Sequence, residues 1–332
     1  DKVASIRKTY TRIRTCKKDR RRLIAIEEGF VVERVFRVLL VLALFVVPFS
    51  VATEVSAAYK GYARPDSLIT AEELKPLADA GSVKVLDVRP ALKYRLGHIP
   101  GSIQVHRSDY NASPAKYDHT RPGPEQWKGL MDRLGIRNED TVILYDDGNS
   151  IDATRLWWIF KLYGHKDVRI LDGTYNAWTA AGYDTQMFAP DIAPSDYVLQ
   201  PANAAILAEK DEVLAFIGDA SAVIVDTRSQ AEHTGAQVAS GAGKGGRIPG
   251  SVWIEWTDAV KDGFFLPAEE LKAMYAAKGV APDKIAVPYC QGGVRGAHTH
   301  FVLSELLGFD NVKLYDLSWL EWSNEDLPYE KD

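Results

Sequence analysis

Cysteine is scarce in this chain of 332 residues, occurring only at Cys16 and Cys290. Two cysteines cannot build the disulfide framework of a small secreted domain or a cysteine-rich metal cluster. Aromatic residues, by contrast, are numerous, with 8 Trp, 15 Tyr and 11 Phe, and this excludes an intrinsically disordered chain. The sequence therefore predicts a folded protein stabilised by packing, and at about 150 residues per domain its length predicts two domains.

The sequence also lacks an apolar run long enough to span a membrane. Residues 38–53 carry no charge, but their apolar centre is ten residues long, whereas a spanning helix needs about 20. Two preceding arginines and small residues at 55–58 are typical of a secretory signal peptide. We therefore predict a leader at 1–58, a start near residue 31, and a periplasmic or secreted protein. An uncleaved membrane anchor is the alternative.

Positive charge is scarce outside this leader. Residues 1–58 hold 12 Lys/Arg and 6 Asp/Glu, whereas residues 59–332 hold 28 and 39. An acidic body gives no reason to expect a nucleic-acid partner, and membrane contact is expected only through an uncleaved leader. If the leader is removed, Cys290 is the only cysteine of the mature protein.

The body of the chain carries one sequence pattern twice. Asp87-Val-Arg89, followed by Gly-His-Ile-Pro-Gly-Ser at 97–102, returns as Asp226-Thr-Arg228, followed by Gly-Arg-Ile-Pro-Gly-Ser at 246–251. Three later matches share an offset of 144 residues. A repeat this long indicates two homologous domains and not a solenoid. We place the first repeat at 59–184 and the second at 205–332, with a proline-containing linker at 185–204.

Strand and helix patterns alternate within each repeat. Short apolar, β-rich runs occur at 83–88, 141–145 and 168–171, and again at 223–225, 285–289 and 312–315, as in buried strands. Thr70-Ala-Glu-Glu73 has the form of a helix capping box, and 267–279 begins with Pro and ends with Gly as helices often do. The predicted fold class is α/β, with two homologous domains that are each a mostly parallel sheet flanked by helices.

Cys290 lies where a strand is predicted to end and a helix to begin. The segment Gln291-Gly-Gly-Val-Arg295-Gly296 follows it, and a helix pattern occupies 297–307. A glycine-rich loop lets several backbone N–H groups point at one spot, and a helix N-terminus adds partial positive charge. Both favour a thiolate, and Arg295 adds a full charge. We predict a nucleophilic Cys290, against the alternative of a buried inert thiol.

Together these motifs resemble those of the tandem-domain rhodaneses, which are thiosulfate or 3-mercaptopyruvate sulfurtransferases, over residues 66–332. The resemblance implies that the second domain is catalytic. The first would be silent and form a wall of the cleft, because Asp146 stands where Cys290 stands in the second repeat. It also implies a persulfide on Cys290, formed from a small sulfur donor and passed to cyanide or a thiol. The backbone amides of the loop would hold that persulfide; they belong to Gln291, Gly292, Gly293, Val294, Arg295 and Gly296.

The role of Arg228 stays open. It matches a family position that can bind the anionic group of the donor, so a substrate-binding role is implied for Arg228 and Arg295. A structural ion pair of Arg228 with Asp226 or Glu232 is the alternative, since a buried arginine is usually paired.

The donor also stays open, because Gln291 and Gly292 fit the family pattern of neither donor. The positive charge of the loop comes only at Arg295, several residues after the cysteine, and it favours the doubly charged thiosulfate. The alternative donor is 3-mercaptopyruvate. Phosphatases and arsenate reductases of the same fold place five residues between Cys and Arg, whereas this loop has four, and the shorter loop suits sulfur better. No metal, nucleotide or other cofactor is expected.

Overall fold

The structure of the protein is a computed structural model that describes residues 59–113 and 115–332. The leader predicted at 1–58, with its signal peptide and Cys16, lies outside these residues. The described residues belong to one compact unit. None of their helices is long and apolar enough to cross a membrane.

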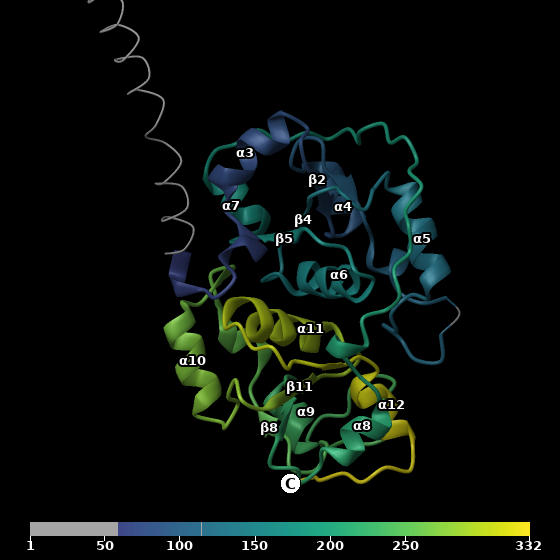
Figure 1. Ribbon diagram of the computed structural model, residues 1–332, viewed down its shortest axis with the longest axis vertical. Helices are drawn as coiled ribbons and strands as arrows, with labels where there is room; N and C mark the ends of the chain where they lie inside the picture. Colours follow the sequence, from purple (N-terminus) through teal and green to yellow (C-terminus); the bar gives the residue numbers. More distant parts are fainter. Residues whose placement is uncertain (1–58, 114) are drawn as a thin grey trace, which may run out of the picture. The chain divides into compact units, whose positions relative to one another are not determined.

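The first repeat, purple to teal in Figure 1, is built on a five-stranded sheet in the order β1-β5-β4-β2-β3, with every pair parallel. Its strands are β1 (Leu68–Ile69), β2 (Lys84–Asp87), β3 (Ile103–Gln104), β4 (Val142–Tyr145) and β5 (Val168–Leu171). Its helices are α3 (Ala71–Asp79), α4 (Ala91–Leu96), α5 (Pro124–Arg133), α6 (Ile151–Leu162) and α7 (Thr174–Ala180).

The second repeat follows the same plan. Its strands are β6 (Leu207–Ala208), β7 (Ala222–Asp226), β8 (Val252–Trp253), β9 (Val260–Lys261), β10 (Phe264–Phe265), β11 (Ile285–Tyr289) and β12 (Leu314–Tyr315). Its helices are α8 (Lys210–Ala215), α9 (Gln230–Thr234), α10 (Ala268–Ala276), α11 (Val294–Phe301) and α12 (Ser318–Asn324). Strands β11, β7 and β8 are parallel, as are β12 and β6, and a parallel bridge from Ala286 to Val312 joins the two sets. The resulting order, β6-β12-β11-β7-β8, matches that of the first repeat, and the β9–β10 hairpin is an addition.

The predicted α/β fold with parallel sheets is thus confirmed. Strands β5 and β11 have the predicted bounds. The capping box is present as well, because the Glu73 amide donates to the Thr70 hydroxyl at 3.2 Å and the Thr70 amide donates to the Glu73 carboxylate at 2.9 Å. Six strands escaped prediction because two residues are too few to show an alternating pattern; these are β1, β3, β6, β8, β9 and β10.

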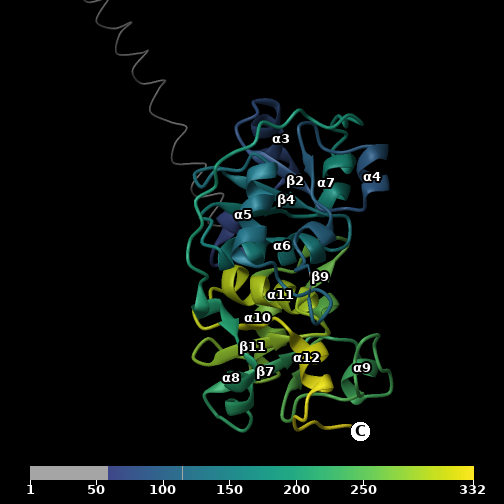
Figure 2. The same cartoon turned by 90° about the vertical axis from the view of Figure 1, so that its right-hand side faces the viewer.

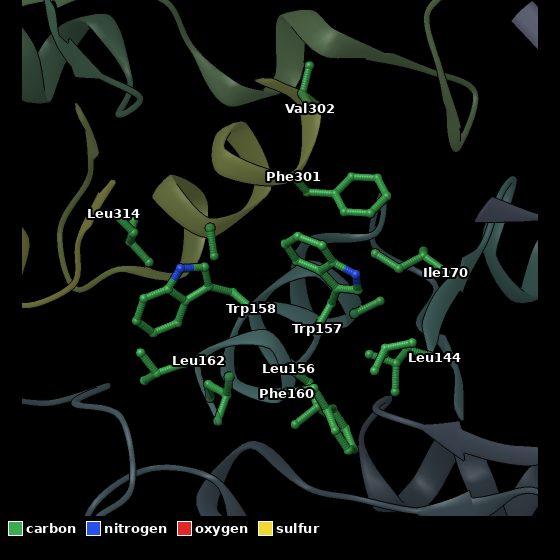
Figure 3. Packing of buried hydrophobic residues seen from close by; sticks show 14 of the residues in the cluster. Leu144, Leu156, Trp157, Trp158, Phe160, Leu162, Ile170, Phe301, Val302 and Leu314 are labelled. Atoms are coloured by element: carbon green, nitrogen blue, oxygen red, sulfur yellow. The ribbon is translucent and has the colours of Figure 1, made fainter. Parts of the chain in front are cut away.

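Helices α6 and α11 lie side by side in both views and join the two repeats (Figures 1 and 2). Trp157 and Trp158 of α6 are fully buried, and the Trp157 ring meets Phe301 of α11 edge-on with 4.9 Å between centroids (Figure 3). One apolar cluster runs through both helices. Because α6 follows Asp146 and α11 follows Cys290, this shared core fixes the two corresponding loops relative to each other.

The repeated Asp-x-Arg and Ile-Pro-Gly motifs form the same buried network in each repeat. In the second repeat, Arg228 donates from Nε and Nη2 to Asp226 at 2.9 and 2.6 Å, and from Nη2 to the Gly246 carbonyl at 2.7 Å. The Tyr289 hydroxyl donates to Asp226 at 2.7 Å and accepts from the Ile248 amide at 3.2 Å. The counterparts in the first repeat are Arg89, Asp87, Gly97, Tyr145 and Ile99. The network ties the end of a central strand to the Ile-Pro-Gly corner, which explains why both motifs recur together.

Candidate active site

Cys290 follows β11 directly, as predicted, but the next helix begins earlier than the sequence indicated. Helix α11 starts at Val294, so Val294, Arg295 and Gly296, which were predicted to precede the helix, form its first turn. The reason is Gly293, whose φ of +80° closes the loop in few residues. A Cβ on Gly293 would lie 2.6 Å from the Asp316 carbonyl oxygen, so the position requires glycine.

The thiol is buried, with Cys290 only 1% exposed, and within the described part of the chain it is a free cysteine. Its backbone is held by the segment after β12. The Trp319 amide donates to the Cys290 carbonyl at 3.0 Å, and the Leu320 amide donates to the Gln291 carbonyl at 2.9 Å. The Ser318 hydroxyl accepts from the amides of Cys290 and Gly293, both at 3.1 Å. The segment around Ser318 is therefore a template for residues 290–296, the Cys290 loop.

Ser318 is a residue that sequence reasoning missed. It adopts φ +54°, which few non-glycine residues do. Its counterpart at the offset of 144 is Thr174, which also carries a hydroxyl and has φ +60°. The repeat contained the signal, because both copies place a hydroxyl two residues after an aspartate.

The predicted cradle has five free amides and not six, because the Gly293 amide is committed to Ser318. Among the residues that the structure describes, the amides of the other predicted members donate to no acceptor; these are Gln291, Gly292, Val294, Arg295 and Gly296. Unpaired N–H groups at a helix N-terminus favour a bound anion. The loop is therefore suited to hold a negative charge beside the sulfur of Cys290.

The first repeat shows such a loop with an anion in place. The Asp146 carboxylate accepts from the amides of Gly148 and Ser150 at 2.9 and 3.0 Å. Its other oxygen accepts from the amides of Asp152 and Ala153 at 2.9 and 3.1 Å. At the offset of 144, three of these donors correspond to free amides of the second repeat: Gly292, Val294 and Gly296. Both oxygens of Asp146 are occupied by N–H donors, which argues against a metal at this carboxylate.

Arg295 is paired with Glu232, a contact that the sequence did not predict. The two side chains form a bidentate ion pair, with Nη1 and Nη2 at 2.6 and 2.8 Å from the carboxylate oxygens. Burial alone would lower the pKa of Arg295, but the hydrogen bond to Glu232 and the nearby Cys290 raise it. The full charge expected from Arg295 is therefore partly balanced by Glu232, and Glu232 is not the partner of Arg228.

Arg228 makes the ion pair with Asp226 that the sequence left as an alternative. Burial alone would raise the pKa of Asp226, but hydrogen bonds from His233 and Arg228 lower it to about 2. The guanidinium carbon of Arg228 lies 4.7 Å from the ring centroid of Trp319. Its Nη1 donates to no acceptor within residues 59–113 and 115–332. The pairing thus uses one edge of the guanidinium and leaves Nη1 for a ligand.

The first repeat also contributes to the surroundings of the Cys290 loop. A Cβ on Gly292 would lie 3.2 Å from both the Asp118 carbonyl oxygen and the His119 ring. Burial lowers the pKa of His119, whose Nδ1 has no partner in the described structure. A cavity of about 290 Å³ adjoins this histidine. It is lined by Ser108, Asn111, Ala112, Ser113, Ala115, Tyr117, Asp118 and His119.

Replacing Ser318 by alanine is expected to lower kcat about tenfold, because the amides of Cys290 and Gly293 lose their common acceptor and the loop loosens. The measurement is the steady-state rate of the sulfur transfer that the family resemblance implies, with unfolding by urea followed in parallel. The matched control is Thr174→Ala in the first repeat, which should change stability only. Equal losses of kcat in both variants would contradict a special role for Ser318.

Comparison with known proteins gives matches to both repeats. Residues 70–181 and 209–325 each match the rhodanese-like domain family, within the domains placed at 59–184 and 205–332, whose boundaries stay a prediction. The sulfur carrier protein TtuD of Thermus thermophilus is 37% identical over 275 residues, covering 80% of this chain and 96% of the relative. The thiosulfate sulfurtransferase of Corynebacterium glutamicum is 35% identical over 277 residues, covering 80% and 91%. A solved structure of an EanB variant with a cysteine persulfide and ergothioneine has a TM-score of 0.73 at 27% identity, covering 81% of this chain and 71% of that one.

Proposed function

Because this chain belongs to the rhodanese family, we propose that it is a sulfurtransferase that carries a sulfane sulfur from thiosulfate to cyanide or a thiol as a persulfide on Cys290. The observation that carries the proposal is the anion held in the Asp146 loop. A carboxylate oxygen of aspartate is two bonds from Cβ, and so is the outer sulfur of a cysteine persulfide. The free amides of the Cys290 loop therefore correspond to the donors that a persulfide anion at that distance needs.

The first step begins with the Cys290 thiolate, which attacks the outer sulfur of thiosulfate. A bond forms between the cysteine sulfur and this sulfane sulfur, while the S–S bond of thiosulfate breaks and sulfite leaves with its electron pair. The negative charge then lies on the persulfide, beside the free amides of the loop. Because these amides are in position before the reaction, little reorganisation accompanies the change in charge.

In the second step, cyanide attacks the outer sulfur and leaves as thiocyanate, and the electron pair of the S–S bond returns to the cysteine as thiolate. Neither step needs an oxidant or a reductant besides donor and acceptor. The persulfide in the EanB structure and the name of the Corynebacterium relative both support this sequence.

Thiosulfate is the proposed donor on two grounds. Nη1 of Arg228 is free to donate to an anion, and the Arg295 guanidinium, although paired with Glu232, interacts electrostatically with Cys290. The Corynebacterium relative is named for thiosulfate. The alternative donor, 3-mercaptopyruvate, is a monoanion and would use the same thiolate and the same cradle.

A comparison of kcat/KM for the two donors, with cyanide as the acceptor, tests the proposal. We expect the higher value for thiosulfate. A clear preference for 3-mercaptopyruvate would overturn the choice of donor but leave the persulfide. No sulfur transfer from either donor by folded protein would overturn the proposed function. Hydrolysis of p-nitrophenyl phosphate, assayed alongside, should stay at background if the loop serves sulfur and not phosphate.

A further inference from the structure

Asp316, in the catalytic repeat, receives both of its ion-pair partners from the silent repeat. Nη1 of Arg155, on α6, donates to one carboxylate oxygen at 2.6 Å, and Nη1 of Arg121 donates to the other at 3.0 Å. The side chains of Asp316 and Arg155 are 1% and 0% exposed. Arg121 also reaches Glu209, which is 61% exposed and therefore screened by water. Without Glu209, the cluster of the buried Arg155 and Asp316 and the partly exposed Arg121 has a net charge of about +1.

This cluster lies directly behind the Cys290 loop. A Cβ on Gly293 would be 2.6 Å from a carboxylate oxygen of Asp316 and 3.1 Å from Nη1 of Arg155. Asp316 is also two residues before Ser318, which holds the amides of Cys290 and Gly293. The two arginines therefore fix the segment that shapes the loop, and they place positive charge near its amides.

The corresponding carboxylate of the silent repeat has different partners. At the offset of 144, Asp172 accepts from the Tyr59 hydroxyl at 2.6 Å and from Lys60 Nζ at 2.7 Å. It also accepts from the Phe265 amide at 3.1 Å. One cation is thus paired with one carboxylate there, and the net charge is zero. The surplus positive charge occurs only behind the loop that carries the cysteine.

We propose that Arg155 and Arg121 are positioning residues for the Cys290 loop, so that the silent repeat supports the thiolate and its persulfide through Asp316. Neither arginine is proposed to touch the donor. Only the expected effect of these arginines on turnover rests on the proposed function. Its effect on thiol reactivity can be measured whether or not the protein transfers sulfur.

The test uses the full chain with Arg155→Met. Alkylation by iodoacetamide is measured against pH and resolved by mass spectrometry into the Cys290 and Cys16 peptides. Removing one positive charge takes the cluster from +1 to 0, so the midpoint for Cys290 should move up by about one pH unit. For sulfur transfer, kcat should fall about tenfold with KM for thiosulfate nearly unchanged, since the donor is not touched.

The double variant Arg155→Met with Asp316→Asn separates charge from structure. It restores the net charge to +1 through Arg121, so the alkylation midpoint should return to that of the wild type. The ion pairs of Arg295 with Glu232 and of Arg228 with Asp226 keep their partners in both variants. His119, whose carbonyl accepts from Nη2 of Arg155 at 2.8 Å, loses that donor equally in both, so the comparison of the two variants isolates the charge of Asp316. The control is Lys60→Met, which unpairs the equivalent Asp172 and should leave the Cys290 midpoint in place.

If Arg155→Met does not fold, as judged by circular dichroism, Arg121→Gln decides, because Arg121 is 23% exposed and Arg155 still neutralises Asp316. Arg121→Gln should raise the alkylation midpoint of Cys290 by less than Arg155→Met does. A wild-type alkylation profile in folded Arg155→Met, or in Arg121→Gln when that variant decides, would overturn the proposal. A shifted midpoint in a protein that transfers no sulfur would leave the positioning role standing and overturn the proposed function alone.

Discussion

Cys290→Ser is expected to lower sulfur transfer by about a thousandfold or more, the largest effect of any single change on activity. A serine hydroxyl is not ionised near neutral pH and forms no persulfide, while the amides of the loop keep their positions. The measurement is the initial rate of thiocyanate formation from thiosulfate and cyanide. Cys16→Ser is the control and should retain the wild-type rate.

Mass spectrometry gives the second readout of the same change. After treatment with thiosulfate, the Cys290 peptide should gain the mass of one sulfur atom, and cyanide should remove it. The corresponding peptide of Cys290→Ser should gain nothing. Sulfur found only on the Cys16 peptide, or a rate within tenfold of wild type for the serine variant, would mean that Cys290 is not the nucleophile.

Arg228→Met is expected to cause the largest loss of stability, about 3–5 kcal/mol in the free energy of unfolding at pH 7. Asp226 is fully buried, and its pKa of about 2 means that it is ionised at that pH. Without Arg228, the Asp226 carboxylate has hydrogen bonds only from neutral donors such as Tyr289 and from His233. Unfolding by urea measures the loss, and adding Asp226→Asn should recover part of it, because the buried charge is then gone.

A matched variant in the first repeat separates structure from donor binding. Arg89 pairs with Asp87 and Gly97 as Arg228 pairs with Asp226 and Gly246. Arg89→Met should therefore lose stability to a similar extent. If Nη1 of Arg228 binds the donor, only Arg228→Met should also raise KM for thiosulfate under conditions where both proteins are folded. Equal KM values in the two variants would assign Arg228 to structure alone.

The sequence predicted those parts of the site that lie close together in the chain. Cys290 directly follows an apolar run and precedes glycines, so its place at the end of a strand could be inferred from local pattern alone. The two-domain organisation was visible because the repeat preserves aspartate, arginine and the Ile-Pro-Gly corner at matching positions. Both inferences depend on short-range rules of strand and turn formation.

The partners of the site residues could not be predicted in the same way. Arg155 and Asp316 are 161 residues apart, and Glu232 and Arg295 are 63 apart. Which acid meets which arginine depends on how helices pack across the two repeats, and no local pattern encodes that. Nearness in sequence makes Glu232 one of two candidate partners for Arg228, whereas the fold brings it to Arg295. The left-handed backbone of Ser318 was equally hidden, because serine gives no sign of it.

The anion in the Asp146 loop has a consequence for how the protein works through a cycle. The Asp146 loop of the first repeat is always occupied, since the carboxyl group is part of the chain; burial raises the pKa of Asp146 to about 6, so the group is mainly ionised at pH 7. In the proposed cycle the Cys290 loop alternates between vacant and filled, and when vacant it has several N–H groups without an acceptor among the described residues. Filling the second loop therefore makes the two halves alike and satisfies these donors. In that cycle the transferred sulfur would stabilise the fold while it is bound to Cys290, and its departure to the acceptor would return the protein to a less symmetrical form.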